Sequence, residues 1–459
     1  MATALDRDFQ TYRTERETAW IDELARWIAV PSVSADPARA DDVRACCALV
    51  IERLRDLGFE TAILETGGHP IAYGRHHAHP GAPTLLIYGH YDVQPADPEA
   101  LWTTSPFALR VRDGKMYGRG SADDKGQVFM HLAALETHLR VRGRLPVNVT
   151  VVVEGEEEIG SPHFDQTLVR ERERFAADVA VISDTAFHAA GIPSLTTSVR
   201  GLVSWEIAVH GPSGDLHSGY FGGTVANPIE ALARLVAQMK DAHGHIVIPG
   251  FYEGVRELDR DQRAEIAALP FDAERMARDL GVPALHGEPE YTPLERMWYR
   301  PTLECNGIWG GYQGPGTKTI IPAFARAKLT ARLVAGQDPH RVRDALIAFV
   351  RRMAPPGVRV EVESAGDVPA VATARDHPAV RAAARALEAA FGRAPVMIGT
   401  GGSIGPVASF ARVFEIPQVL MGFGLPDDAI HAPDERFDLD QFRRGIDALA
   451  FFYDELART

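Results

Sequence analysis

Four short apolar runs set the strongest constraint on how this chain can fold. Each has the length of a buried strand rather than of a helix. The runs are residues 85–88, 149–153, 179–182 and 419–423. Helical stretches separate them, the clearest at residues 128–139 and 379–391. Because strands that alternate with helices build a mostly parallel sheet, we expect an α/β domain with helices on both faces.

The region between the third and the fourth run has a different pattern. It contains alternating, strand-like segments and helical stretches. The strand-like segments lie around residues 203–209, 325–333 and 358–362, and the helical stretches at 228–239 and 341–352. These elements fit a smaller α+β layer of about 165 residues. We therefore predict a main domain formed by residues 1–198 and 367–459, and an inserted domain formed by residues 199–366.

Charge and composition exclude several classes of protein. The 459 residues include 62 acidic and 48 basic ones, and the resulting formal net charge of -14 disfavours binding to nucleic acid or to an anionic membrane. No stretch reaches the apolar length of a membrane span, and the first residues, MATALDRDFQ, lack the apolar core of a signal peptide. We therefore expect a cytoplasmic protein. Among the three cysteines, Cys46 and Cys47 are adjacent, which indicates buried side chains rather than a disulfide framework.

Polar side chains follow the first apolar run directly. The segment GHYDVQP, residues 89–95, places His90 in a loop after a strand, where α/β sheets bind their ligands. One ring nitrogen of His90 could hold a metal ion. The Asp92 carboxylate would then accept the proton of the other nitrogen and fix the tautomer.

A segment with two glycines, YGRGSADDKG at residues 117–126, leads into the next helical stretch. The glycines suggest a dinucleotide-binding loop. However, Asp123 stands where the third glycine of that fingerprint belongs, and a carboxylate there repels a pyrophosphate. A carboxylate before a helix is better suited to bridging two cations, one on each oxygen. We therefore favour a cation site.

The remaining apolar runs are also followed by candidate ligands. The segment EGEEEIG, residues 154–160, places four carboxylates in one loop, where they repel one another unless cations lie among them. A solvated acidic loop is the alternative, but such loops rarely follow a buried strand so abruptly. Asp184 follows the third run and His431 the fourth. Together with His90 and Asp123, these side chains predict one set of hard metal ligands.

These segments together resemble the dinuclear metallopeptidases of family 20, which include carnosinase, cytosolic non-specific dipeptidase, aminoacylase, acetylornithine deacetylase and glutamate carboxypeptidase. The resemblance covers nearly the whole chain. It implies two ligand groups that share Asp123 as a bridge: His90, Asp123 and Asp184 in one, and Asp123, Glu158 and His431 in the other. It also implies that the main domain is the catalytic, metal-binding one and that the inserted domain serves as lid and dimerisation domain.

The resemblance also implies the catalytic groups. Glu157, directly before Glu158, matches the general base that takes a proton from a water activated between the two ions and later passes it to the leaving amine. Asp92 would orient the metal ligand His90. The segment HSGYFGG, residues 217–223, is similar to a hallmark segment of the family. It implies that His217 stabilises the tetrahedral oxyanion, in the family usually in the site of the partner subunit of a homodimer.

Candidate substrate-binding residues also come from the resemblance. Arg332, Thr319 and Ser403, the last within GTGGSIG at residues 399–405, fall where dipeptidase relatives hold the C-terminal carboxylate of the substrate. A guanidinium and a glycine-rich backbone both suit an anion. A surface salt bridge and a simple turn are the alternatives. The aspartate at position 184, where deacetylase and carboxypeptidase relatives generally carry glutamate, and the longer lid favour a dipeptidase acting on small peptides with a free N-terminus.

Other functions remain open at this point. An N-acyl amino acid amidohydrolase or a carboxypeptidase would use the same scaffold, metals and base. A phosphoesterase also uses two metals, but the base at Glu157 and the acidic composition favour amide hydrolysis. A non-catalytic relative would be expected to lack ligands or base, and none is missing. We expect two divalent ions per subunit, with zinc as the first choice and manganese as the alternative.

Overall fold

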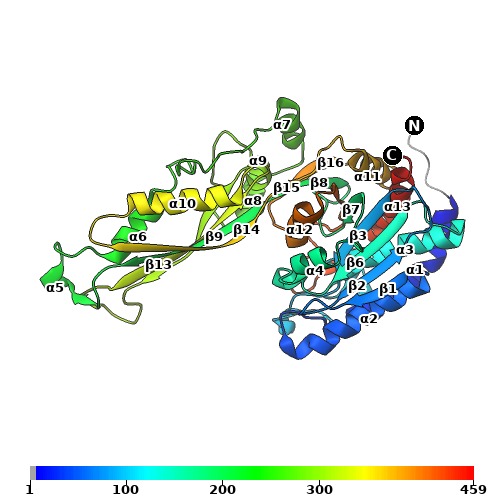
Figure 1. The fold of residues 1–459 in the computed structure, drawn as a ribbon, viewed down its shortest axis with the longest axis horizontal. Coiled ribbons are helices and arrows are strands. Elements are labelled where there is room, and N and C mark those ends of the chain that lie inside the picture. The colour runs from blue at the N-terminus through cyan, green and yellow to red at the C-terminus, as the bar shows by residue number, and fades with distance from the viewer. Residues whose placement is uncertain (1–6) are drawn as a thin grey trace. The chain divides into compact units, whose positions relative to one another are not determined.

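The computed structural model describes residues 7–459, which form two compact units (Figure 1). Unit 1 consists of the chain up to Thr197, Thr373–Ile398 and Gly405–Thr459. Unit 2 consists of Ser198–Ala372 and Gly399–Ile404. The short segment Gly399–Ile404 thus belongs to unit 2, although both segments next to it in the sequence belong to unit 1.

Unit 1 is built around a mixed sheet with a parallel centre. Its main strands are β1 (Glu60–Leu64), β2 (Ile71–His76), β3 (Thr84–His90), β6 (Asn148–Glu154), β7 (Val179–Ile182), β8 (Ser194–Val199) and β17 (Gln418–Leu420). Strands β6, β3, β7 and β17 lie side by side and run parallel. Antiparallel strands flank them, with β2 and β1 beside β6 and β8 beside β17. The predicted α/β sheet is therefore confirmed, and each apolar run contributes one central strand.

Helices cover both faces of this sheet. One large apolar core joins alternate residues of the strands, such as Ile87 and Val151, to several helices. These helices are α1 (Arg7–Ile28), α2 (Ala40–Asp56), α3 (Lys125–Arg142), α11 (Pro378–Phe391) and α13 (Leu439–Leu456). On the other face, Tyr88 packs edge-on against Phe164 of α4 (Phe164–Arg170) and Phe410 of α12 (Gly405–Phe414). Burial on both faces explains why these strands are apolar at nearly every position.

Short elements complete unit 1. They are β4 (Arg110–Arg112), β5 (Lys115–Tyr117), β18 (Arg436–Asp438), the 3-10 turns η1 (Pro37–Arg39), η2 (Glu99–Leu101) and η3 (Glu157–Ile159), and β16 (Val396–Thr400), whose last two residues belong to unit 2. The start of α3 is fixed by Lys125, whose buried ammonium donates to the carbonyls of Trp27 (2.9 Å) and Val30 (2.8 Å). The Trp27 carbonyl lies in the last turn of α1 and the Val30 carbonyl just beyond it, where the regular hydrogen bonds of the helix end. Lys125 thereby anchors the loop that carries Asp123.

Unit 2 contains an antiparallel sheet in the order β11-β13-β9-β14. These strands are β9 (Gly201–His210), β11 (Thr302–Gly310), β13 (Phe324–Leu333) and β14 (Arg359–Val368). Apolar side chains of one face, such as Trp205 and Leu329, pack against α6 (Pro228–Ala237) and α10 (Pro339–Met353). The other face carries the polar residues that alternate with them, including Arg332 on β13. The predicted α+β layer is thus present.

Unit 2 also contains elements that the sequence did not predict. They are β11, the small ribbon of β10 (Leu216–His217) and β12 (Ile320–Ile321), the strand β15 (Val371–Ala372) and the short helices α5 (Ser218–Phe221), α7 (Arg260–Ala267), α8 (Ala273–Asp279) and α9 (Pro293–Tyr299). Within residues 7–459, none of the helices has both the length and the apolar character that a membrane span requires.

Candidate metal centre

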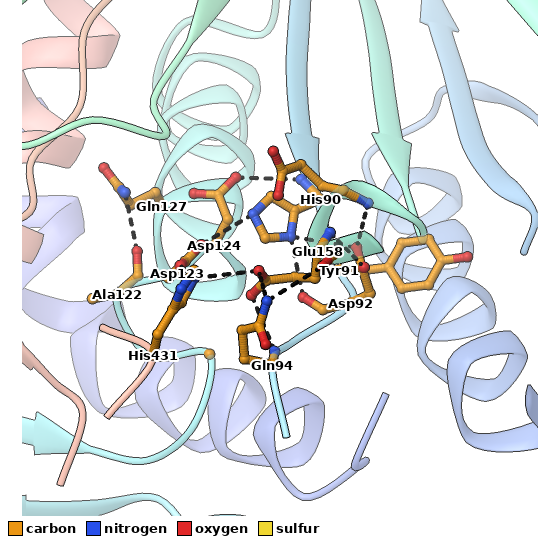
Figure 2. Close-up of polar contacts among 12 residues, drawn as sticks. His90, Tyr91, Asp92, Gln94, Ala122, Asp123, Asp124, Gln127, Glu158 and His431 are labelled. Carbon is orange, nitrogen blue, oxygen red and sulfur yellow. Dashed lines mark hydrogen bonds and ion pairs between the residues drawn. The ribbon is translucent and has the colours of Figure 1, made fainter. Parts of the chain in front are cut away.

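His90 is the last residue of β3 (Figure 2), and its side chain is fully buried. Its Nε2 atom lies 3.1 Å from Oδ1 of Asp123. Its Nδ1 atom lies 3.1 Å from the main-chain carbonyl oxygen of Asp92 and 3.4 Å from the carboxylate of that residue. The carbonyl is therefore the nearer acceptor for an Nδ1 proton, whereas the sequence pointed to the carboxylate. In either case Nε2 is left free to bind a metal ion beside Asp123.

Asp123 lies in the loop between β5 and α3 and is joined to Asp124 by a cis peptide bond. Its two oxygens face different histidines. Oδ1 faces His90, and Oδ2 lies 2.9 Å from Nε2 of His431, which in turn lies 3.2 Å from Oε2 of Glu158. A carboxylate that offers one oxygen to each of two imidazoles is placed to bridge two cations.

Two groups of candidate ligands meet at this carboxylate. His90, Asp123 and Asp184 form one, and Asp123, Glu158 and His431 form the other; in each group the ligand atoms lie within 4.8 Å of one another. Nitrogen and oxygen ligands each bind zinc at about 2.1 Å, so two ligands of one ion are roughly 3.0–3.4 Å apart, depending on the angle between them. The measured contacts of 2.9–3.2 Å fit that geometry. The residues present therefore fit a pair of divalent ions, and these are the groups that the resemblance implied.

The centre carries an excess of buried negative charge. Burial, together with the charge of Asp123, raises the pKa of both Asp184 and Asp124 well above the usual range. Burial and the neighbouring Glu158 raise the pKa of Glu157 to about 7. In the opposite sense, Asp123 and Glu158 raise the pKa of His431 to about 10. Carboxylates crowded in this way are stabilised by cations among them, which is what a dinuclear metal site supplies.

Glu157 and Glu158 lie on the turn η3, directly after β6. The carboxylate of Asp92 holds this turn, since it accepts hydrogen bonds from the backbone N–H groups of Glu157 (3.3 Å) and Glu158 (3.1 Å) and from the hydroxyl of Ser34 (2.6 Å). The Glu158 carboxylate accepts two further bonds from Gln94, at 2.9 and 3.0 Å. Asp92, itself in the loop after His90, thus connects this loop to the turn that carries the proposed base.

The structure also shows a supporting carboxylate that sequence reasoning missed. Glu435 is fully buried and accepts hydrogen bonds from the backbone N–H groups of Gly120 (3.0 Å), Ala122 (3.0 Å) and Asp123 (3.2 Å). It also forms a 2.6 Å ion pair with the buried guanidinium of Arg119. The conformation of the loop that carries Asp123 is therefore fixed by a residue far away in the sequence.

Arg119 extends this support to two more loops. Its second terminal nitrogen donates to the carbonyls of Pro95 (3.2 Å) and Ala432 (3.4 Å). Pro95 belongs to the loop that begins at His90, and Ala432 follows His431. One buried ion pair therefore connects three of the segments that supply candidate ligands. No spacing or motif reveals it, because Arg119 and Glu435 are 316 residues apart.

The remaining predicted residues lie in unit 2, in two pairs. His217 is the last residue of β10 and Thr319 directly precedes β12, and the carbonyl of Thr319 accepts a hydrogen bond from the N–H of Ser218 (3.0 Å). The exposed ring of His217 accepts from the N–H of Gly219 (3.0 Å). Arg332 and Ser403 form the second pair, since a terminal nitrogen of Arg332 donates to the Ser403 hydroxyl at 2.6 Å. Within residues 7–459, no hydrogen bond joins the two pairs.

Comparison with known proteins gives a consistent result. The model for peptidase family M20/M25/M40 matches residues 86–455. A Schizosaccharomyces pombe protein named Cys-Gly metallodipeptidase dug1 is 31% identical, over 100% of this chain and 99% of its own length. The crystal structure of human carnosine dipeptidase 1 has a TM-score of 0.80 and 28% identity, with 99% of each chain covered. That of a metallo-carboxypeptidase, Sso-CP2, from Sulfolobus solfataricus has a TM-score of 0.83 and 30% identity, over 96% of this chain and 99% of the other.

Proposed function

The chain belongs to peptidase family M20/M25/M40 and is a metallodipeptidase, and we propose that it cleaves the amide bond of dipeptides or small peptides with a free N-terminus. The single observation that carries this proposal is the Asp123 carboxylate, which faces His90 with one oxygen and His431 with the other. Cys-Gly and carnosine, after which relatives are named, are the first substrates to test.

The proposed reaction assigns a task to each side chain of the centre. When bound, two divalent ions supply Lewis acidity, which makes a water a nucleophile near neutral pH and polarises the amide carbonyl. Glu157 belongs to neither ligand group, so its carboxylate is free to accept a proton from that water and to donate it to the leaving nitrogen. A pKa of about 7 in the metal-free centre suits both directions of this transfer. Asp92 keeps Glu157 in place through the backbone of η3.

Zinc is the metal we propose first, and manganese the alternative. Each ligand group combines one imidazole with two carboxylates. Both zinc and manganese bind to ligands of this kind, and the set suits zinc well. Metal analysis of protein purified without added metal, followed by reactivation of the chelated protein with each ion, distinguishes the two.

We also propose a homodimer in which His217 completes the site of the partner subunit. The exposed position of His217 in unit 2 supports this assignment, because an oxyanion donor must be open to a substrate. Inactive His217→Ala subunits mixed with inactive Glu157→Gln subunits are expected to recover part of the activity, since a mixed dimer holds one intact site. No recovery in a mixture shown to contain mixed dimers would contradict this part of the proposal.

Arg332, Ser403 and Thr319 are proposed to hold the C-terminal carboxylate of the substrate. The guanidinium of Arg332 has only the Ser403 hydroxyl as its partner within residues 7–459, which leaves its charge available for an anion. An N-acyl amino acid amidohydrolase or a carboxypeptidase would also need this anchor, and the likeness to the Sulfolobus carboxypeptidase keeps that alternative open.

A cytoplasmic location, predicted from the sequence, is part of the proposal and can be tested by cell fractionation.

The deciding experiment is hydrolysis of free dipeptides, N-acetylated dipeptides and longer peptides by metal-free protein reconstituted with zinc or manganese. We expect metal-dependent cleavage of the free dipeptides and its loss in Glu157→Gln. Glu156→Gln is the matched control, because Glu156 lies in the same loop but its carboxylate pairs with His163 at 2.9 Å. Cleavage of only the acetylated set, or release of C-terminal residues from the longer peptides alone, would support the alternatives instead.

A further inference from the structure

Buried arginines in this protein normally have a carboxylate partner. Arg53, Arg119 and Arg300 are each less than a tenth exposed. Their partners are Glu136 for Arg53, Glu435 for Arg119 at 2.6 Å, and Glu288 for Arg300 at 2.6 Å. This is the expected arrangement, because a guanidinium removed from water without an opposite charge is strongly destabilised.

Arg200, directly after β8, is partly buried but, within the described part of the chain, has no carboxylate partner of this kind. Its Nε atom donates to the carbonyl of Gly401 (2.9 Å), and its backbone N–H donates to the carbonyl of Gly402 (3.2 Å). One terminal nitrogen is shielded from solvent and has no hydrogen-bond partner among the residues that the structure describes. A side chain on Gly401 would come within 2.9 Å of the other terminal nitrogen, so a glycine leaves that edge of the guanidinium clear.

Arg332 reaches the same turn from β13. It donates to the Ser403 hydroxyl, and this hydroxyl donates to the backbone carbonyl of Arg200 (2.6 Å). Burial lowers the pKa of Arg332, and burial together with the charge of Arg332 lowers the pKa of Arg200 to about 10. The two guanidinium groups therefore lie close enough to repel each other around one short turn of unit 2.

No carboxylate of residues 7–459 neutralises this pair of charges. The acidic side chain whose field reaches Arg200 is Glu304, which is largely exposed and forms its own 3.1 Å ion pair with Lys240. A single substrate carboxylate would neutralise only one of the two guanidinium groups. A C-terminal aspartate or glutamate would bring two carboxylates on one residue, which matches the two cations.

We propose that Arg200 and Arg332 form a two-cation subsite that selects peptides ending in aspartate or glutamate. This inference rests on the proposed function, in which Arg332 holds the terminal carboxylate, and adds Arg200 as the residue that binds the carboxylate of the C-terminal side chain. Ser403 and the glycines at 401 and 402 set the position of both guanidinium groups through the hydrogen bonds described above.

The test compares kcat/KM for Ala-Glu and Ala-Ala. In the wild-type enzyme we expect Ala-Glu to be preferred. In Arg200→Gln we expect the ratio of the two values to fall about tenfold or more, which is the effect of removing one charged hydrogen bond. Arg200→Lys should restore part of the ratio, because it keeps the charge. Arg326→Gln is the matched control: Arg326 lies on β13, as Arg332 does, but pairs with Glu206 at 2.7 Å and should leave the ratio unchanged.

A binding measurement separates this inference from the proposed function. L-glutamate and L-alanine are titrated calorimetrically into the full-length protein, wild type and Arg200→Gln. Tighter binding of L-glutamate that is lost in Arg200→Gln supports the subsite even if no dipeptide is hydrolysed, in which case the proposed function fails alone. Equal binding of the two amino acids, or an Arg200→Gln variant that loses Ala-Glu and Ala-Ala hydrolysis to the same extent, overturns the subsite and leaves the proposed function standing.

Discussion

Unit 1 buries carboxylates in two very different ways. Glu136 of α3 is only 3% exposed, and it accepts hydrogen bonds from Tyr12 (2.6 Å), Arg16 (3.0 Å) and Trp20 (2.8 Å) in addition to its ion pair with Arg53. Although burial opposes ionisation, Arg53 and these donors hold the pKa of Glu136 down to about 2. The chain itself therefore provides everything that this carboxylate needs to stay charged.

The carboxylates of the candidate metal centre lack such partners. Asp123 faces two histidines, and Asp184, with a pKa far above the usual range, shows how costly an additional negative charge is there. The difference between the two regions indicates where a cation from outside the chain belongs. The negative charge of Glu136 is neutralised by an arginine of the chain itself, which indicates a structural role. The negative charge around Asp123 and Asp184 is not neutralised until cations bind, which indicates a functional role.

The largest effect is expected from removing the bridge. Asp123→Asn should lower hydrolysis by about a thousandfold or more and bring the metal content well below two ions per chain, because both ligand groups lose the carboxylate that they share. Metal analysis after dialysis and an activity assay check this. Two tightly bound ions in Asp123→Asn would show that the two groups do not share this residue.

Removing the Glu136 carboxylate from its contacts with Arg53 and the neighbouring donors should instead lower the stability of the fold. Glu136→Ala leaves Arg53 buried without its main partner, and we expect the free energy of unfolding to fall by about 3–5 kcal/mol. Chemical denaturation of the metal-loaded protein measures this. The folded fraction should keep its two metal ions and its activity. If Glu136→Ala emptied the metal centre without lowering stability, the contrast between the two regions would be wrong.

The same carboxylate predicts a dependence of stability on pH. Since the pKa of Glu136 falls from an ordinary 4.5 to about 2 on folding, its contribution is complete above about pH 4.5 and is lost as the pH falls toward 2. A shift of this size corresponds to a contribution on the order of 3 kcal/mol at neutral pH. Metal-free protein should be compared with Glu136→Gln, and the difference in unfolding free energy should shrink across this range. A constant difference would mean that Glu136 is not held in its charged form.

The ion pair between Arg119 and Glu435 is buried like the pair between Arg53 and Glu136, but it supports the loops of the candidate metal centre. Glu435→Gln keeps the shape of the side chain but weakens the bonds to the backbone of the Asp123 loop. We expect metal affinity to fall about 10- to 100-fold, the range seen for residues that orient metal ligands. Competition with a chelator measures it. The Glu455→Gln variant is a control, since Glu455 also pairs with arginine, at Arg458, but lies on α13 away from the ligand loops.

Much of this arrangement could be predicted from the sequence, and the reasons are physical. Strands such as β7 are buried on both faces, so they appear in the sequence as continuous apolar runs. Candidate metal ligands can then be recognised because they follow directly after such a run. The strand β11 was missed because it lies at the edge of its sheet, is largely exposed and contains a bulge after Cys305, so its side chains show no clean alternation.

The supporting contacts could not be predicted. Arg119 and Glu435 meet only because the chain folds. Arg200 and Arg332 both donate hydrogen bonds to one six-residue segment, Gly399–Ile404, which belongs to unit 2 although its sequence neighbours belong to unit 1. A motif identifies a residue type at a spacing along the chain. It does not identify a charge that lacks a partner, which requires knowing every neighbour.

The smallest expected effect is also the sharpest test of the difference between the two regions. One substitution should change the free energy of unfolding in opposite directions without and with bound metal. In the metal-free protein, burial and the charge of Asp123 oppose the ionisation of Asp184, so the neutral isostere in Asp184→Asn should raise the free energy of unfolding by about 1 kcal/mol. With zinc bound, the same substitution removes a proposed ligand and should lower the free energy of unfolding. Glu136→Gln should destabilise the protein in both states. Denaturation with chelator and with zinc compares the two variants, and an Asp184→Asn variant that is less stable in both states would place Asp184 among the structural carboxylates.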